Sequence, residues 1–242
     1  MSISVSFERQ WRAAFEREFS HTRRSAMTQI ALSFNEQYNE RFVEGQSLCP
    51  YAREGRKRGE TQRFTHFQSG DDWSALVQLF LNIASDETQV VTQVIFPDLE
   101  IEAESWIEFC HHITRLGHAA RGGGDVLANA ALHPRLSYRT TSAYSLIPLF
   151  RRAPDPTIQW VRLDRLEKLY EGRAKGSTFI DPAKLLSMLD RPAVKSLYDR
   201  VAEANLATAL GYGIGRMESE LSELYQDAQR AYRDIPPDIV PH

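Results

Sequence analysis

A short run of β-branched residues restricts the fold of this chain more than any other feature. Residues 89–96 read QVVTQVIF, a composition typical of a buried strand, and Pro97 ends the run. VLANAAL (126–132) predicts a second strand, and RFTHF (63–67) predicts a short third one. The chain therefore contains a β-sheet, although this pattern leaves the order and direction of its strands open.

Amphipathic helices separate these strands. DDWSALVQLFLNIAS (71–85) places its apolar residues on one face and begins with aspartate, and a further helix is expected over about 102–117. SAYSLIPLFRRAPDP (142–156) predicts a short helix or an irregular segment broken by prolines. Strands that alternate with helices predict an α+β fold, in which a small central sheet is covered by helices and helix exceeds strand.

The sequence divides into three segments. Residues 1–44 and 177–242 carry helical apolar stripes, whereas residues 45–176 hold the predicted strands. We therefore expect a core domain over 45–176, with helical extensions at both ends. The stripes of the extensions are expected to be core, packed either on the middle domain or against a second copy in a homodimer.

The composition is that of an ordinary globular protein. The chain has 242 residues, 42% of them hydrophobic, and a formal net charge of −3, which calls for neither nucleic acid nor an anionic membrane as partner. The N-terminus lacks the apolar core of a signal peptide, and no stretch approaches the length of a membrane span. Two cysteines do not make a disulfide framework, so we expect reduced thiols and a cytoplasmic protein.

Two glycine clusters and one histidine cluster do not indicate a nucleotide or metal site. RGGGD (121–125) follows a helix and precedes a strand, the reverse of a nucleotide-binding loop, and GYGIGR (211–216) lies between helices. Both are expected to be helix ends. FCHH (109–112) lacks metal-ligand spacing, so Cys110 is expected in the core and no metal is expected. The sequence does not indicate a cofactor.

Cys49 and His133 are the candidate reactive residues. In GQSLCPYAREGRKRG (45–59), Cys49 precedes Pro50, which predicts a short helix from Pro50 with Cys49 at its N-cap. The helix dipole and Arg53 then favour a thiolate, while a buried, inert thiol remains the alternative. His133 ends a predicted strand in ALHP, and strand ends of helix-covered sheets are common ligand sites.

The segments SLCPYAREGRKRGETQRF, ALHP and SAYSLIPLFRRA resemble a bacterial family of domains of unknown function. That family carries an Asn-Leu-Cys-Pro-Phe-Ala motif, His-Pro motifs and a Ser-Pro-Tyr-Pro segment, and the resemblance spans about residues 35–170. Phe96 and Pro148 stand where relatives have histidine, which argues against a histidine-rich metal site. The positions that the resemblance implies for a site are Cys49, Arg53, Arg63, His133, Ser142, Tyr144 and Arg151.

We expect these side chains to converge on one pocket for a small anionic molecule. Cys49 is expected to be nucleophile or acid/base and His133 its proton partner. Arginines bind carboxylate or phosphate bidentately, so Arg53, Arg63 and Arg151 are expected to hold the anion. Ser142 and Tyr144, which match positions of the family's last motif, are also expected to bind the substrate. An enzyme of open reaction class is the leading hypothesis; a non-catalytic binding or accessory protein and a purely structural role for these residues are the alternatives.

Overall fold

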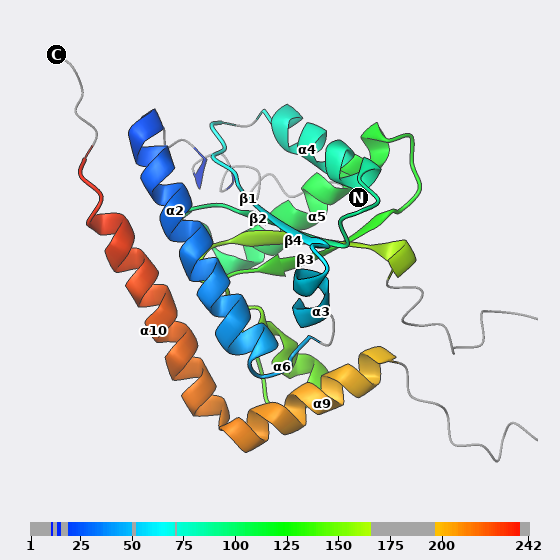
Figure 1. Ribbon diagram of the computed structural model, residues 1–242, viewed down its shortest axis with the longest axis vertical. Coiled ribbons are helices and arrows are strands. Elements are labelled where there is room, and N and C mark those ends of the chain that lie inside the picture. Colours follow the sequence, from blue (N-terminus) through cyan, green and yellow to red (C-terminus); the bar gives the residue numbers. More distant parts are fainter. Residues whose placement is uncertain are drawn as a thin grey trace, which may run out of the picture.

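The computed structural model describes residues 11, 14–15, 19–49, 52–70, 72–165 and 197–237. These residues form a four-stranded mixed sheet with helices on both faces (Figure 1). The predicted α+β class, with more helix than strand, is confirmed.

The sheet has the strand order β1-β2-β4-β3. Its strands are β1 (Thr61–Thr65), β2 (Val91–Ile95), β3 (Leu127–Leu132) and β4 (Thr157–Arg162). β1 and β2 are parallel, and β4 is antiparallel to both β2 and β3, so β1, β2 and β3 all run in one direction. The two edges of the sheet are therefore β1 and β3.

Three of the four strands agree with the sequence predictions, and β4 was missed. Its sequence, TIQWVR, follows the proline-rich stretch APDP. A central strand usually reads as a continuous apolar run, because both of its faces are buried. Here Gln159 interrupts that run and the buried Arg162 ends it, so the pattern of a central strand is concealed.

α4 (Ser74–Ser85) and α5 (Ala103–Ala120) cover one face of the sheet. They agree with the two helices that periodicity predicts between the strands. Their apolar side chains, such as Phe80 and Phe109, pack with Val94, Ile158 and Trp160 of the sheet in one cluster. Such burial of aromatic surface is the main stabilising term for this half of the protein.

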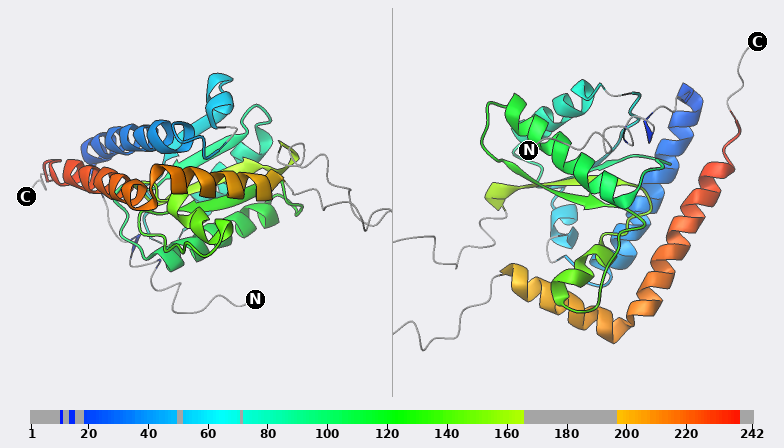
Figure 2. Two further views of the ribbon diagram at one scale, coloured as in Figure 1. Left: turned by 90° about the horizontal axis from the view of Figure 1, so that it is seen from below. Right: turned by 180° about the vertical axis from the view of Figure 1, so that it is seen from behind.

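The opposite face is covered by helices from both ends of the chain. α2 (His21–Tyr38) continues as a π-helical segment, η1 (Asn39–Glu44), and runs beside α10 (Ile214–Arg233) in the opposite direction (Figures 1 and 2). α9 (Leu197–Tyr212) meets α10 at Gly213, whose φ of 95° is easily adopted only by glycine. α6 (Ala143–Phe150) packs on α9, and α3 (Ala52–Lys57) follows η1.

These helices share their core with the sheet. One cluster joins Tyr38 of α2, Leu132 of β3, Leu149 of α6 and Met217 of α10. Residues of all three predicted segments thus meet in a single cluster, while the division into a core domain and two extensions stays a prediction. Within the described residues, no helix combines the length and the apolar character needed to cross a membrane.

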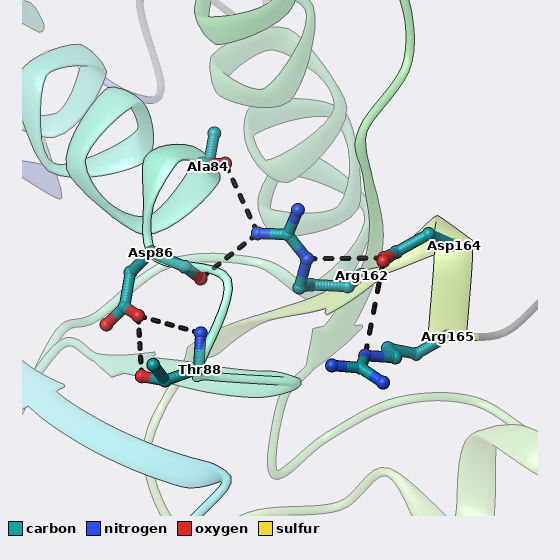
Figure 3. A network of polar contacts seen from close by, with 6 residues as sticks. All are labelled: Ala84, Asp86, Thr88, Arg162, Asp164 and Arg165. Atoms are coloured by element: carbon teal, nitrogen blue, oxygen red, sulfur yellow. Dashed lines mark hydrogen bonds and ion pairs between the residues drawn. The ribbon is translucent and has the colours of Figure 1, made fainter.

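Arg162 ties the end of β4 to the end of α4 (Figure 3). Its Nη1 donates to the carbonyl oxygens of Ala84 at 3.2 Å and of Asp86 at 3.0 Å, and its Nε donates to Asp164 at 3.2 Å. The last carbonyls of a helix lack intrahelical partners, and a cation there also complements the helix dipole. The buried arginine that hides β4 in the sequence is therefore a cap for α4.

Gly117 of α5 lies against the Phe80 ring of α4. A Cβ on Gly117 would lie 2.3 Å from Phe80 Cδ1. Replacing a helical glycine by alanine usually stabilises by about 0.5–1 kcal/mol, but overpacking destabilises by about 1–3 kcal/mol. We expect Gly117→Ala to lower the free energy of unfolding, measured by urea denaturation.

The control is Gly211→Ala in α9, where an added Cβ meets no atom within 4 Å. That variant should be neutral or slightly more stable than the wild type. Equal gains in stability for both variants would show that α4 and α5 do not approach as closely as described.

Candidate functional site

A cavity of about 250 Å³ lies between the sheet and the helices α3, α6 and α9. Three arginines line it: Arg56 of α3, Arg63 of β1 and Arg151, which follows α6. Cys49 lines it as well, so three of the seven predicted site residues, Cys49, Arg63 and Arg151, share this space. We call it the arginine cavity.

A row of polar side chains forms the floor of the arginine cavity. Arg63, Gln93 and Gln159 are paired in register on β1, β2 and β4, so their side chains lie on the same face of the sheet. Arg63 Nε donates to Gln93 Oε1 at 3.3 Å, and Gln93 Nε2 donates to Gln159 Oε1 at 2.9 Å. On β3 the row ends at Ala130, which is paired with Gln159 and has no polar side chain.

The hydrogen bonds fix the orientation of both amides. A guanidinium only donates, so the oxygen of Gln93 faces Arg63 and its NH2 group faces Gln159. Asn39 of η1 donates to the same oxygen at 3.3 Å, which satisfies a side chain that is only 3% exposed. The oxygen of Gln159 is thereby used, and its NH2 group is directed away from β2.

The arginines of the cavity differ in how they are paired. Arg56 binds the buried carboxylate of Glu44 with two hydrogen bonds of 2.8 Å, and this contact lowers the pKa of Glu44. Arg63 has its single recorded hydrogen bond with Gln93, and no carboxylate of the described residues lies within ion-pair distance of it. Burial lowers the pKa of Arg63, while Glu36 and Glu44 act in the opposite direction.

Arg53, the third arginine predicted for the site, lies beside the cavity without lining it. Its Nη2 donates to the backbone oxygen of Glu44 at 3.0 Å, and its side chain is exposed. Arg53 thus holds the end of η1 in place. Its charge contributes to the lowered pKa of the Glu44 carboxyl group.

Cys49 is exposed and lies between η1 and α3. Its backbone N–H donates to Val43 O at 3.4 Å, and its carbonyl accepts from Ala52 N at 3.3 Å. The described part of α3 begins at Ala52, and the expected helix start at Pro50 lies outside the described residues. The other cysteine, Cys110, is fully buried in the core, as predicted.

His133 lies in a different cavity from Cys49. This second space, of about 520 Å³, is lined by His133, Asp155, Arg135 and three further acids, and we call it the histidine cavity. Side chains alternate between the two faces of a strand, so Leu132 faces the arginine cavity while His133, the next residue, faces away from it. The structure therefore does not bring the expected Cys49–His133 pair together in one pocket.

Both ring nitrogens of His133 are hydrogen-bonded. Nδ1 accepts from Arg135 N at 3.1 Å, so Nε2 carries the proton and donates to Ile101 O at 3.0 Å. Burial lowers the pKa of His133 to about 4. A neutral ring held in this way positions the loop before α5 rather than accepting a proton from a thiol.

Ser142 and Tyr144 line neither cavity. Ser142 is the N-cap of α6: its Oγ accepts from Ser145 N at 3.1 Å, and Ser145 Oγ accepts from Ser142 N at 3.0 Å. Tyr144 is half exposed, and its hydroxyl contacts Asp199 of α9. The two residues predicted to bind substrate thus begin α6 and join it to α9.

Gln93 and Gln159 were missed as site residues. A detectable signal existed, because each glutamine interrupts a run of β-branched or aromatic residues, VTQVI in β2 and TIQWV in β4. A buried amide needs hydrogen-bond partners, so two such strands in one chain indicate a polar row in the sheet. Asp155 was also missed: it is 2% exposed, accepts from Asp98 N at 3.0 Å and from Tyr232 Oη at 2.8 Å, and burial raises its pKa to about 7.

Comparison with known proteins does not identify the chain. No family model matches it, and neither the curated proteins nor the solved structures contain a match. The resemblance to the bacterial family of unknown function stays a prediction. Within the part of the chain that the structure describes, no three His, Cys, Asp or Glu side chains are grouped so that they could hold a metal ion.

His133 and Asp155 contribute to the pH dependence of stability with opposite signs. The pKa of His133 falls from 6.5 to about 4 on folding, so the unfolded chain binds more protons in this range and stability rises with pH. The pKa of Asp155 rises from 3.8 to about 7, so the folded protein binds more protons and stability falls as pH rises through this range. Shifts of this size correspond to roughly 3–4 kcal/mol each.

We expect variants of these two residues to show opposite pH profiles. In the wild type, the contribution of Asp155 to the free energy of unfolding falls as pH rises, and Asp155→Asn removes it. The free energy of unfolding of the variant minus that of the wild type should therefore rise between about pH 4 and 7. His133→Gln should show a relative free energy that falls over about pH 4 to 6.5. Urea denaturation at several pH values measures both, and differences that do not change with pH would refute the assignment.

Proposed function

We propose that this protein binds a small anionic molecule in the arginine cavity. The observation that carries the proposal is the state of Arg63, a partly buried guanidinium whose recorded hydrogen bond is to an amide and not to a carboxylate. Removing a cation from water without a paired anion is unfavourable, and burial accordingly lowers the pKa of Arg63. A bound anion would offset that penalty through bidentate hydrogen bonds.

The surrounding charges support an anion rather than a cation. Glu44 is the acid that lines the cavity in the described residues, and Arg56 already neutralises it. Arg151 adds a further positive charge to the lining. The cavity is smaller than the roughly 300–1,000 Å³ of typical drug-sized sites, which fits a small metabolite.

We favour binding over catalysis by the Cys49 thiol, because the described lining of the cavity holds no suitable general base. Among the described lining residues, the titratable groups besides Cys49 and the arginines are Tyr38 and Glu44. The Tyr38 hydroxyl donates to the carbonyl of Phe150, and burial raises its pKa; Glu44 is ion-paired and its pKa is lowered. Neither group suits the role of a base at neutral pH, so an enzyme using Cys49 stays the second candidate.

The cellular setting is part of the same proposal. Cys49 and Cys110 do not form a disulfide, and cysteines stay reduced in reducing compartments. We therefore place the protein in the cytoplasm. The apolar residues of α2 and α10 are partly buried against one another within the chain. The homodimer expected from the apolar stripes of the terminal helices stays a prediction.

We expect inorganic phosphate to raise the melting temperature of the wild type through Arg63. A ligand at ten times its Kd stabilises by about 1.4 kcal/mol, which corresponds to about 3–6 °C for a protein of this size. In Arg63→Gln, the part of this increase in melting temperature that comes from phosphate binding should be lost, as measured by thermal denaturation. Phosphate also stabilises proteins by exclusion from their surface, so the informative quantity is the difference between wild type and variant.

The matched control is Arg58→Gln, directly after α3, because Arg58 does not line the cavity and its side chain is 65% exposed. Arg58→Gln should respond to phosphate as the wild type does. An equal response of Arg63→Gln and the wild type would contradict the anion site.

Cys49 should be the thiol that reacts in the native protein. It is exposed whereas Cys110 is fully buried, so a chromogenic disulfide reagent should modify one thiol per chain, and Cys49→Ser should abolish the reaction. Since Cys49 lines the arginine cavity, a bound anion should slow its modification. Modification of both thiols at equal rates would contradict the described packing.

A further inference from the structure

Two of the three arginines of the arginine cavity, Arg63 and Arg151, belong to opposite edges of the sheet. Arg63 is on the edge strand β1, whereas Arg151 is next to the other edge strand, β3, where its carbonyl accepts from His133 N at 3.0 Å. Neighbouring strands lie about 4.8 Å apart, so three steps separate the backbones of Arg63 and Ala130 by about 14 Å. Arg63 is also held toward β2 by its bond to Gln93.

The middle of the floor offers a hydrogen-bond donor. The oxygen of Gln159 accepts from Gln93, so the NH2 group of Gln159 faces β3, where Ala130 supplies no acceptor. No hydrogen bond of this NH2 group to a described residue is recorded, and Gln159 lines the cavity. A ligand that crosses the floor therefore needs an acceptor near its centre.

The walls between the two arginines are largely apolar. Leu48, Ile147 of α6, and Val201 and Ala202 of α9 line the cavity from three different segments. Apolar walls favour a hydrocarbon chain, and they disfavour a ligand that is charged along its whole length.

We infer that the ligand is a short linear dicarboxylate with an oxygen acceptor near its middle. One carboxylate binds Arg63, the other binds Arg151, and the central oxygen accepts from Gln159 Nε2. Carboxylates suit the planar fork of arginine, and a chain with two carboxylates fits a cavity of about 250 Å³. This inference rests on the proposed anion site and specifies its ligand class.

Calorimetric titration with a series of probes tests the inference. The probes are acetate and propionate as single carboxylates, the diacids succinate, glutarate, adipate, pimelate and suberate, and inorganic phosphate. We expect one diacid length to bind best, with an affinity roughly tenfold or more above that of the single carboxylates, because each charged hydrogen bond contributes about 1.5–3 kcal/mol. An oxo group at the central carbon of the best diacid should tighten binding further.

Variants assign each end of the ligand. Arg63→Gln and Arg151→Gln should each reduce the best diacid to about the affinity of a single carboxylate, while Arg58→Gln should bind like the wild type. Should a glutamine variant fail to fold, Arg63→Lys and Arg151→Lys keep the charge and lose only the bidentate geometry. Gln159→Met should remove the preference for the oxo diacid over the plain diacid, a ratio that a general loss of stability does not change.

The outcomes separate this inference from the proposed function. If single carboxylates or phosphate bind as tightly as every diacid, the two-ended ligand is wrong and the anion site stands. If phosphate binds more tightly than all carboxylates, the carboxylate assignment is overturned. If none of the probes binds the wild type, both the inference and the proposed function fail.

Discussion

A buried glutamine in the centre of a sheet is the constraint on which the cavity depends. Gln93 is 3% exposed, and a buried amide is unfavourable unless both of its ends are hydrogen-bonded. It is satisfied by Arg63 of β1, Asn39 of η1 and Gln159 of β4, so four segments are placed by one side chain. Apolar side chains of α2 and α10 pack against Ile95 in the next row of the sheet, and the cavity opens over the polar row.

The end of β3 separates the two cavities. Leu132 and His133 are neighbours in sequence, yet strand alternation places them on opposite faces, and the backbone bond from His133 to Arg151 joins both linings. The prediction grouped His133 with Cys49 on the family resemblance, which does not show to which face of the sheet a side chain points. Leu132 and His133 lie at the same end of β3, but side chains alternate between the faces of a strand, so consecutive residues line different cavities.

Local patterns were sufficient for most of the fold, and less so for the site. Helical patterns predict α4 and α5, which present an apolar face to the core, and short strand-like runs predict three of the strands. β4 was missed because the partners that bury its polar residues, Gln93 for Gln159 and the end of α4 for Arg162, lie far away in sequence. The arginine cavity likewise depends on the pairing of Arg63 with Gln93, a register that no local pattern encodes. Arg63, Arg151 and Cys49 could be named from sequence, whereas the amides between the arginines needed the sheet.

The π-helical segment η1 lets one helix end contribute two polar side chains to the cavity. In an α-helix, residues five apart differ by about 140° around the axis, so Asn39 and Glu44 would face different directions. η1 has the i→i+5 hydrogen bonds of a π-helix, seen from Gly45 N to Glu40 O at 2.9 Å, and both Asn39 and Glu44 line the cavity. A Cβ on Gly45 would lie 2.4 Å from Arg41 O, so glycine at this position permits the turn. Asn39 holds Gln93 while Glu44 engages Arg56, and this division of partners leaves the Arg63 guanidinium without a described carboxylate partner.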